Sequence, residues 1–212
     1  MKIALIGASG FVGSAVLEEA VSRGHDVIAL VRNPDKVEKS PRVTARKVDA
    51  NDTKALPTAI GDADVVISAF VGPRGDPDQY TKHRAGSASI IEAAKTAGKR
   101  LIVVGGAGSL HATDGSQFVD SDQFPKEYKN EARAARDVLN DIKKETALDW
   151  TFVSPAFVLK PGERTGKFRL GADSPIFDDK GESTISAADL AVALIDETEQ
   201  PKHTRKRFTV GY

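Results

Sequence analysis

The chain alternates short apolar runs, rich in Val and Ile, with longer stretches in which apolar residues recur at helical spacing. This alternation is typical of βαβ units around a buried parallel sheet. It predicts an α/β fold with a Rossmann-like, doubly wound parallel sheet and helices on both faces. The predicted strands are Lys2–Gly7, Asp26–Arg32, Val43–Asp49, Asp64–Val71, Arg100–Gly105, Trp150–Ser154 and Arg207–Gly211.

The stretches between the strands predict the crossover helices. The first helix follows the first strand, and Gly24 supplies the residue that ends it. Further helices are predicted over Arg84–Ala97 and Glu131–Lys144, and Ser186 can cap the last one. Proline and glycine interrupt the pattern from Ser154 to Glu182, so this stretch is expected to be a small excursion of loop and short hairpin that could cover a cleft.

Composition narrows the function classes. With 212 residues, 40% of them hydrophobic, the chain has the size of one domain over residues 1–212. The 30 Lys and Arg balance the 30 Asp and Glu, so neither nucleic acid nor a membrane surface is an expected partner. Without cysteine and with four scattered histidines, no metal site is expected. No apolar run approaches a membrane span or signal peptide, so a cytoplasmic protein is expected.

A glycine-rich turn directly follows the first strand and opens the first helix. The first glycine permits the tight turn, the second lets a pyrophosphate approach the backbone, and the third lets the helix pack on the sheet. The helix amino terminus then faces the anion. A strand before the turn, a helix after it and a second strand at the proper distance predict dinucleotide binding. The candidate contacts are Gly7, Ser9, Gly10, Phe11, Val12 and Gly13.

The end of the second strand indicates which dinucleotide is expected. NAD-binding proteins usually place an acidic residue there for the ribose hydroxyls, but this strand ends Val31-Arg32-Asn33. A guanidinium can pair two donors with a 2′-phosphate, so Arg32 favours NADP(H) over NAD(H), which stays an alternative cofactor. The other interpretation of Arg32 is a solvated surface arginine.

The third and fourth strands end at the same edge, where open α/β sheets bind ligands. Asp49 and Ala50 follow the third strand, and Ala69 and Phe70 follow the fourth, so all four are candidate contacts to adenine or pyrophosphate. For Asp49 a role as a turn residue or helix cap ahead of Thr53 has equal weight.

Four segments carry a family resemblance: Ile6–Gly13, Val103–Leu110, Asp149–Pro155 and Phe208–Tyr212. On these the chain resembles the atypical short-chain dehydrogenase/reductases nearly end to end. It is most similar to the NADH-flavin reductase group, related to biliverdin reductase B and flavin reductases. The resemblance implies a nicotinamide beside the turn Gly105–Ser109, with the stretch Ser154–Phe157 along its other edge. The candidate contacts there are Gly105, Gly106, Ala107, Pro155, Ala156 and Phe157.

The resemblance also exposes a missing pair. Hydride enzymes of the wider superfamily carry a tyrosine and, four residues later, a lysine, whereas here Tyr128 is followed by Ala132. Aligning on the helix instead gives Ala132 and Arg136. A flavin takes hydride at a ring nitrogen and its proton from water, so it does not need the pair. Ser109 and Tyr128 are the candidate catalytic residues, against the alternatives of a turn serine and a packed surface tyrosine.

Four further features have weaker chemical interpretations. His83 and His111, in or near loops after strands four and five, are candidate proton shuttles, although most such histidines are solvated. The Gly72–Asp78 loop is either a rim of the substrate pocket or an inert turn. The basic cluster His203–Arg207 is expected to solvate a strand end.

These observations predict an NADPH-binding oxidoreductase that passes hydride to a flavin, quinone or similar planar acceptor. The alternative is a non-catalytic NADP(H)-sensing regulatory protein of the same class, which the missing pair supports. Sugar-nucleotide epimerase or dehydratase chemistry is disfavoured because the carboxy-terminal region is too short for a substrate domain. A homodimer is the general expectation for such a protein.

Overall fold

Eight strands of the computed structural model, which describes residues 1–212, form one sheet in the order β3-β2-β1-β4-β5-β6-β10-β8. The chain runs outward from β1 to β3 and then returns to build the other half from β4. All neighbours in the sheet are parallel except β8, which is antiparallel to β10. The strands are β1 (Lys2–Ile6), β2 (Asp26–Val31), β3 (Val43–Lys47), β4 (Val65–Ser68), β5 (Arg100–Val104), β6 (Trp150–Pro155), β8 (Arg169–Gly171) and β10 (Lys206–Gly211). The predicted strands and the doubly wound sheet are therefore confirmed.

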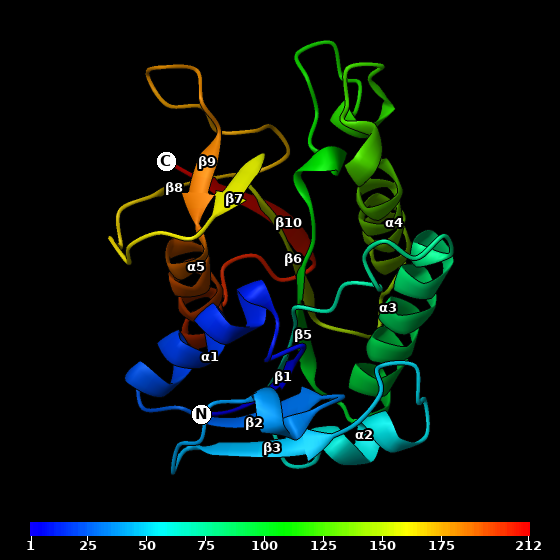
Figure 1. Ribbon diagram of the computed structural model, residues 1–212, viewed down its shortest axis with the longest axis vertical. Helices are drawn as coiled ribbons and strands as arrows, with labels where there is room; N and C mark the ends of the chain where they lie inside the picture. Colours follow the sequence, from blue (N-terminus) through cyan, green and yellow to red (C-terminus); the bar gives the residue numbers. More distant parts are fainter.

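Helices cover both faces of the sheet (Figure 1). The helices α1 (Phe11–Ser22) and α5 (Ala187–Glu199) pack together on one face, and α2 (Ala55–Ile60), α3 (Gln79–Thr96) and α4 (Lys126–Ile142) cover the other. Successive strand residues point to opposite faces. In β1, Ile3 therefore enters the core under α1 and α5, whereas Ala4 enters the core under α3 and α4. Two covered faces explain why the strands are continuous apolar runs.

The predicted helices are present, but two of them begin earlier than the pattern indicated. α3 starts at Gln79 and α4 at Lys126, and both first turns are polar and lie outside the apolar stripes. A tertiary contact holds the first turn of α3, since the Tyr80 hydroxyl donates to Asp137 in the middle of α4 at 2.6 Å. The short α2 and the three 3-10 helices η1 (Pro34–Lys36), η2 (Ala107–Ser109) and η3 (Phe118–Asp120) gave no periodic signal. The Ser186 cap is confirmed, because its Oγ accepts the Asp189 N–H at 2.9 Å.

The excursion after β6 differs from the predicted hairpin. β7 (Val158–Lys160) pairs in parallel with β9 (Thr184–Ser186), and β8 leaves this pair to extend the main sheet. Parallel strands cannot be joined by a tight turn, so a long connection separates them. No helix of the chain combines the length and apolar character that crossing a membrane requires.

Candidate cofactor and acceptor site

The glycine turn joins β1 to α1 at the carboxyl edge of the sheet. Gly7 has a φ of +81°, and a Cβ there would lie 2.8 Å from the carbonyl oxygen of Ala69. A Cβ on Gly13 would lie 2.0 Å from the carbonyl oxygen of Gly7. The fold itself therefore requires glycine at both positions, and the close packing predicted for the third glycine has its geometric basis.

Gly10 is different. The nearest atom to a Cβ there would be the carbonyl oxygen of Gly7, at 3.3 Å. It is exposed, as are Ser9 and Phe11, while Val12 is half-buried. The first turn of α1 has no side-chain cap and no acidic residue. Its N–H groups and the positive end of the helix dipole are thus available to an anion beside Gly10. This cradle fits a pyrophosphate.

Arg32 and Asp49 lie at neighbouring strand ends. Arg32 is exposed, and its side chain makes no hydrogen bond or ion pair within the chain. Asp49 accepts hydrogen bonds from the backbone N–H and the side-chain amide of Asn51, at 2.8 and 2.9 Å. These bonds, with a smaller contribution from the charge of Arg32, lower the pKa of Asp49. Asp49 thus stabilises the turn that follows β3, which is one of the two roles expected for it. The guanidinium of Arg32 is free to bind an anion.

Phe70 follows β4 and packs its ring against α3. A Cβ on Gly86 would lie 2.4 Å from that ring, so the glycine makes room for it. His83 meets the ring edge-on, with centroids 5.9 Å apart. His83 is buried, its Nδ1 has no partner, and burial lowers its pKa, so the expectation of a solvated histidine is wrong here. Ala50 is buried and Ala69 half-buried.

The turn after β5 is closely packed. A Cβ on Gly105 would lie 2.0 Å from the ring of Phe152, whereas Gly106 and Ala107 are half-exposed. Ser109 is 1% exposed, and its hydroxyl and carbonyl oxygens each accept a hydrogen bond from Nη1 of Arg207 at 3.1 Å. The Ser109 hydroxyl therefore faces a buried cation. A contact between this turn and a nicotinamide stays a prediction.

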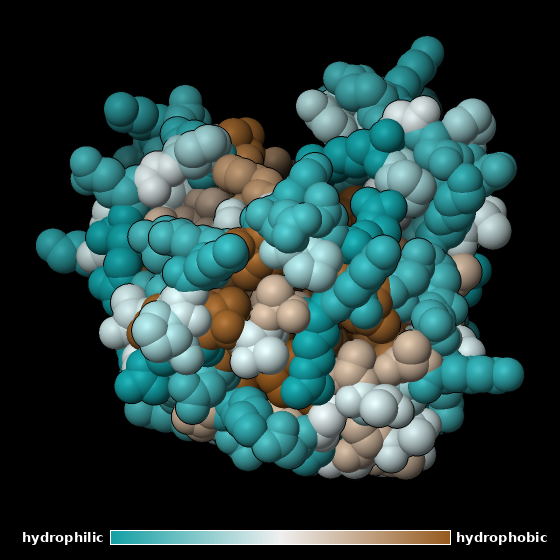
Figure 2. Space-filling model, turned by 60° about the horizontal axis from the view of Figure 1, so that its bottom comes forward, coloured by the Kyte–Doolittle hydropathy of each residue, from teal (hydrophilic) through white to brown (hydrophobic).

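Three phenylalanines from distant segments meet at the carboxyl edge. Phe157, which follows β6, has its ring centroid 4.7 Å from that of Phe118 in η3 and 6.1 Å from that of Phe177 in the loop after β8. Phe157 and Phe177 are 37% and 44% exposed. We call these three rings the aromatic wall. Figure 2 shows the molecule notched between two lobes, with apolar side chains on one side of the notch.

Only Phe157 of the aromatic wall was predicted as a site residue. Phe118 lies in the short η3 and Phe177 in a loop, both without periodicity, so no local signal could have identified them. Pro155 and Ala156 are buried at the end of β6. Tyr128 lies in the first turn of α4, is 61% exposed and makes no side-chain hydrogen bond within the chain. This exposure favours the surface-tyrosine interpretation.

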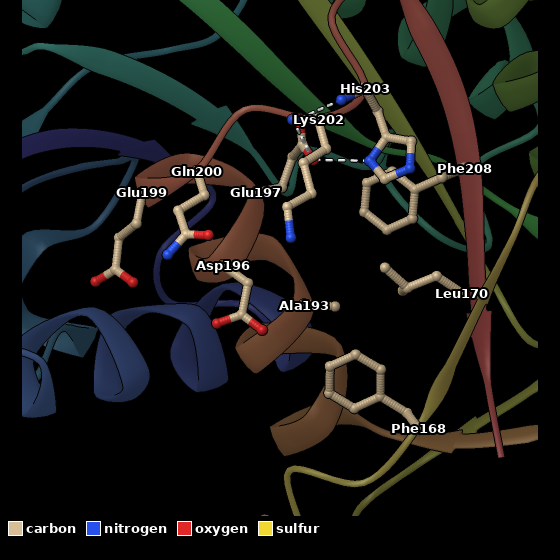
Figure 3. Close-up of a pocket in the computed structure, with 10 residues that line it drawn as sticks. All are labelled: Phe168, Leu170, Ala193, Asp196, Glu197, Glu199, Gln200, Lys202, His203 and Phe208. Carbon is tan, nitrogen blue, oxygen red and sulfur yellow. Dashed lines mark hydrogen bonds and ion pairs between the residues drawn. The ribbon is translucent and has the colours of Figure 1, made fainter.

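A separate cavity of about 270 Å³ lies where α5 ends, beside β8 and the start of β10 (Figure 3). Its walls include Phe168, Leu170 and Phe208. Glu197 accepts hydrogen bonds from Nδ1 of His203 at 2.8 Å and from the backbone N–H of that residue at 3.0 Å. Glu197 and His203 are thus engaged with each other. No group of three or more His, Cys, Asp or Glu residues is arranged to hold a metal ion.

A larger groove of about 830 Å³ starts at the glycine turn and follows α1. One side is formed by Ser9 and Phe11, and the other by the segment from Lys36 to Pro41. The groove is therefore continuous with the anion cradle at Gly10.

Comparison with known proteins shows the family of the chain. Residues 7–201 match a family described as NAD(P)H-binding. The Bacillus subtilis protein YwnB is 40% identical over 217 residues, which cover 99% of this chain and 98% of that protein. A Bacteroides thetaiotaomicron structure, provisionally named an epimerase, has a TM-score of 0.92 at 43% identity, covering 100% of this chain and 96% of that one. A Streptococcus pneumoniae structure, provisionally named an NADH-flavin reductase, has a TM-score of 0.88 at 36% identity, covering 100% and 99%.

Proposed function

Because the chain belongs to the NAD(P)H-binding family, we propose that it is an NADPH-dependent oxidoreductase that passes hydride to a flavin, quinone or similar planar acceptor. The glycine turn would hold the pyrophosphate over Gly10, at the open amino terminus of α1. Arg32 would bind the 2′-phosphate, which its lack of a partner within the chain supports. The nicotinamide supplies the hydride when the cofactor is bound.

The aromatic wall is the observation that carries the choice of acceptor. Its ring centroids are 4.7 and 6.1 Å apart, within the range of stacked and edge-to-face aromatic pairs. Phe157 also belongs to the segment that the family resemblance puts along the nicotinamide. A flat ring system seated on the wall would lie beside the cofactor, held by stacking rather than by hydrogen bonds. The chain would then contribute orientation, and water in the open notch would contribute the proton.

The test measures oxidation of NADPH by the purified protein. The decrease in NADPH absorbance monitors the reaction. FMN, riboflavin and a water-soluble quinone are added in turn, with NADH as the competing donor and protein-free mixtures as controls. We expect saturable turnover with at least one planar acceptor and a preference for NADPH. Binding of NADPH without turnover of any acceptor would contradict the proposal, and failure to bind either nucleotide would contradict its premise.

A second function is favoured by the state of the two candidate catalytic hydroxyls. Ser109 is buried against Arg207, and Tyr128 is solvated, so neither hydroxyl is placed between acid–base partners. A protein that senses NADP(H) and signals to a partner needs no such groups. The same assay separates the two functions, because a sensor binds NADPH tightly and leaves every acceptor unreduced.

A further inference from the structure

Arg207 is a buried cation whose donors reach two separate loops. Its side chain is 1% exposed, although it stands in a basic cluster that the sequence indicated to be solvated. Nη1 donates to the carbonyl and hydroxyl oxygens of Ser109, and Nε donates to Oδ1 of Asp173 at 2.8 Å, with Nη2 on the same oxygen. A buried guanidinium is costly unless its donors are satisfied. Arg207 therefore fixes the turn after β5 and the loop after β8 to β10.

Both of these loops lead to the aromatic wall. On one side, Leu110 follows Ser109, and its carbonyl oxygen accepts the N–H of Phe118 at 3.2 Å. On the other side, Asp173 begins the short segment that ends at Phe177. The two loops are also joined directly, because the carbonyl oxygen of Asp173 accepts the N–H of His111 at 2.8 Å.

The third ring is held by the strand next to Arg207. Phe157 leaves the end of β6, and β6 pairs with β10 in a register that puts Arg207 opposite Phe152. The loop that carries Phe177 packs on β10, since Ile176 contacts Gly211. A second anchor is Arg169, whose Nη2 donates to the carbonyl oxygen of Phe177 at 2.5 Å. A change at Arg207 would thus loosen the starts of the two loops that lead to Phe118 and Phe177, while Phe157 stayed on the sheet.

We propose that Arg207 is a positioning residue: through Ser109 and Asp173 it holds Phe118 and Phe177 against Phe157, and so sets the affinity for the planar acceptor. This inference rests on the proposed function for its kinetic consequence. A purely structural arginine would stabilise the whole fold and affect cofactor and acceptor alike.

The chain offers a matched control in Arg100. Its side chain is 14% exposed, and it is also held by one carboxylate, with Nη2 2.5 Å from Oε1 of Glu197 and Nη1 2.9 Å from the carbonyl oxygen of that residue. Arg100 begins β5, at the amino edge of the sheet, away from the aromatic wall. Arg100→Lys therefore removes a comparable guanidinium fork without touching the loops that carry the rings.

The kinetic experiment compares Arg207→Lys, Asp173→Asn and Arg100→Lys. We expect the first two to raise the KM for the acceptor by about tenfold, as lost stacking would, while the Kd for NADPH changes less than about twofold. Arg100→Lys should lower the Tm and leave the acceptor KM unchanged. Asp173 is 56% exposed, so Asp173→Asn should fold and can replace Arg207→Lys in the test if that variant does not fold. An unchanged acceptor KM in both variants, or equal effects in Arg100→Lys, would overturn the proposal.

Hydrogen–deuterium exchange gives a readout that needs no turnover. We expect faster exchange over residues 107–118 and 172–178 in Arg207→Lys and Asp173→Asn but not in Arg100→Lys. If the wild-type protein reduces no acceptor, the proposed function fails, while the exchange pattern still decides whether Arg207 orders the wall. Unchanged exchange over both segments would refute that ordering role.

Discussion

The carbonyl oxygen of Gly7 occupies the place that a side chain at Gly13 would need, since a Cβ there would lie only 2.0 Å away. This contact sets how closely α1 approaches the turn that precedes it. The neighbouring Gly10 has no such clash, with 3.3 Å to the same oxygen. The fold therefore requires glycine at position 13, whereas at position 10 the proposed cofactor is the reason for a glycine.

Alanine at these two positions should have different effects. Gly13→Ala must move α1 or the turn, so we expect a loss of at least about 1–3 kcal/mol in the free energy of unfolding. Gly10→Ala should fold nearly as well as the wild type but weaken NADPH binding by about tenfold, because its methyl group meets the pyrophosphate. Urea unfolding and NADPH titration measure the two effects. Full NADPH affinity in Gly10→Ala would argue against a pyrophosphate at this turn.

Arg32→Ala should weaken NADPH binding and leave NADH binding nearly unchanged. A charge-assisted contact contributes about 1.5–3 kcal/mol, so the Kd for NADPH should rise by roughly 10- to 100-fold. Arg42→Ala is the control, because Arg42 is also exposed but pairs with Asp26 at the start of β2, the opposite end of that strand. Fluorescence titration with both nucleotides provides the measurement. Equal losses for NADPH and NADH would leave Arg32 no role in the 2′-phosphate preference.

Removing one ring of the aromatic wall should affect the acceptor rather than the cofactor. We expect Phe177→Ala to raise the acceptor KM by roughly three- to tenfold, from the loss of one aromatic contact. Leu170→Ala removes an exposed apolar side chain of β8 outside the wall and should leave the KM unchanged. Steady-state kinetics at saturating NADPH tests this. Identical KM values in the two variants would mean that the acceptor binds elsewhere.

The strands and the glycine turn could be predicted from the sequence because their signals are local. A buried parallel strand is a continuous apolar run, and the spacing of Gly7, Gly10 and Gly13 is set within one turn. The β7–β9 pair could not be predicted in the same way, since its strands are three residues each and their pairing joins distant parts of the chain. Their short runs look like interruptions in a loop.

The proposed acceptor side of the site depends on contacts that only the folded chain creates. Phe118, Phe157 and Phe177 come from three segments, and no spacing relates them. The burial of Arg207 could not be predicted either, because a cluster of basic residues normally indicates solvent exposure. In the folded chain Ser109 and Asp173 pack against this position and bury it. Local sequence signals therefore predicted the glycine turn, whereas no local signal predicted the aromatic wall.

Glu19 provides a pH-dependent test of the fold around α1. Its side chain is 4% exposed and accepts hydrogen bonds from Nε and Nη2 of Arg164, at 2.6 and 2.8 Å, and from Nε of Arg23 at 2.7 Å. The bonds from Arg164, with those from Arg23, outweigh burial and hold the pKa of Glu19 below its ordinary 4.5. The carboxylate therefore stabilises the folded state above pH 4.5, and this contribution is lost as the pH falls through the lower pKa of the folded protein.

Glu19→Gln should accordingly lower the free energy of unfolding by about 2 kcal/mol at neutral pH, with a difference from the wild type that narrows as the pH drops below the ordinary carboxyl range. Glu18→Gln is the control, since Glu18 is the exposed neighbour on the same helix and makes no hydrogen bond through its side chain. Urea unfolding across a series of pH values measures both variants. A Glu19→Gln difference that stayed constant into the acid range would mean that this side chain stabilises α1 by packing, and that the ion pair with Arg164 contributes little.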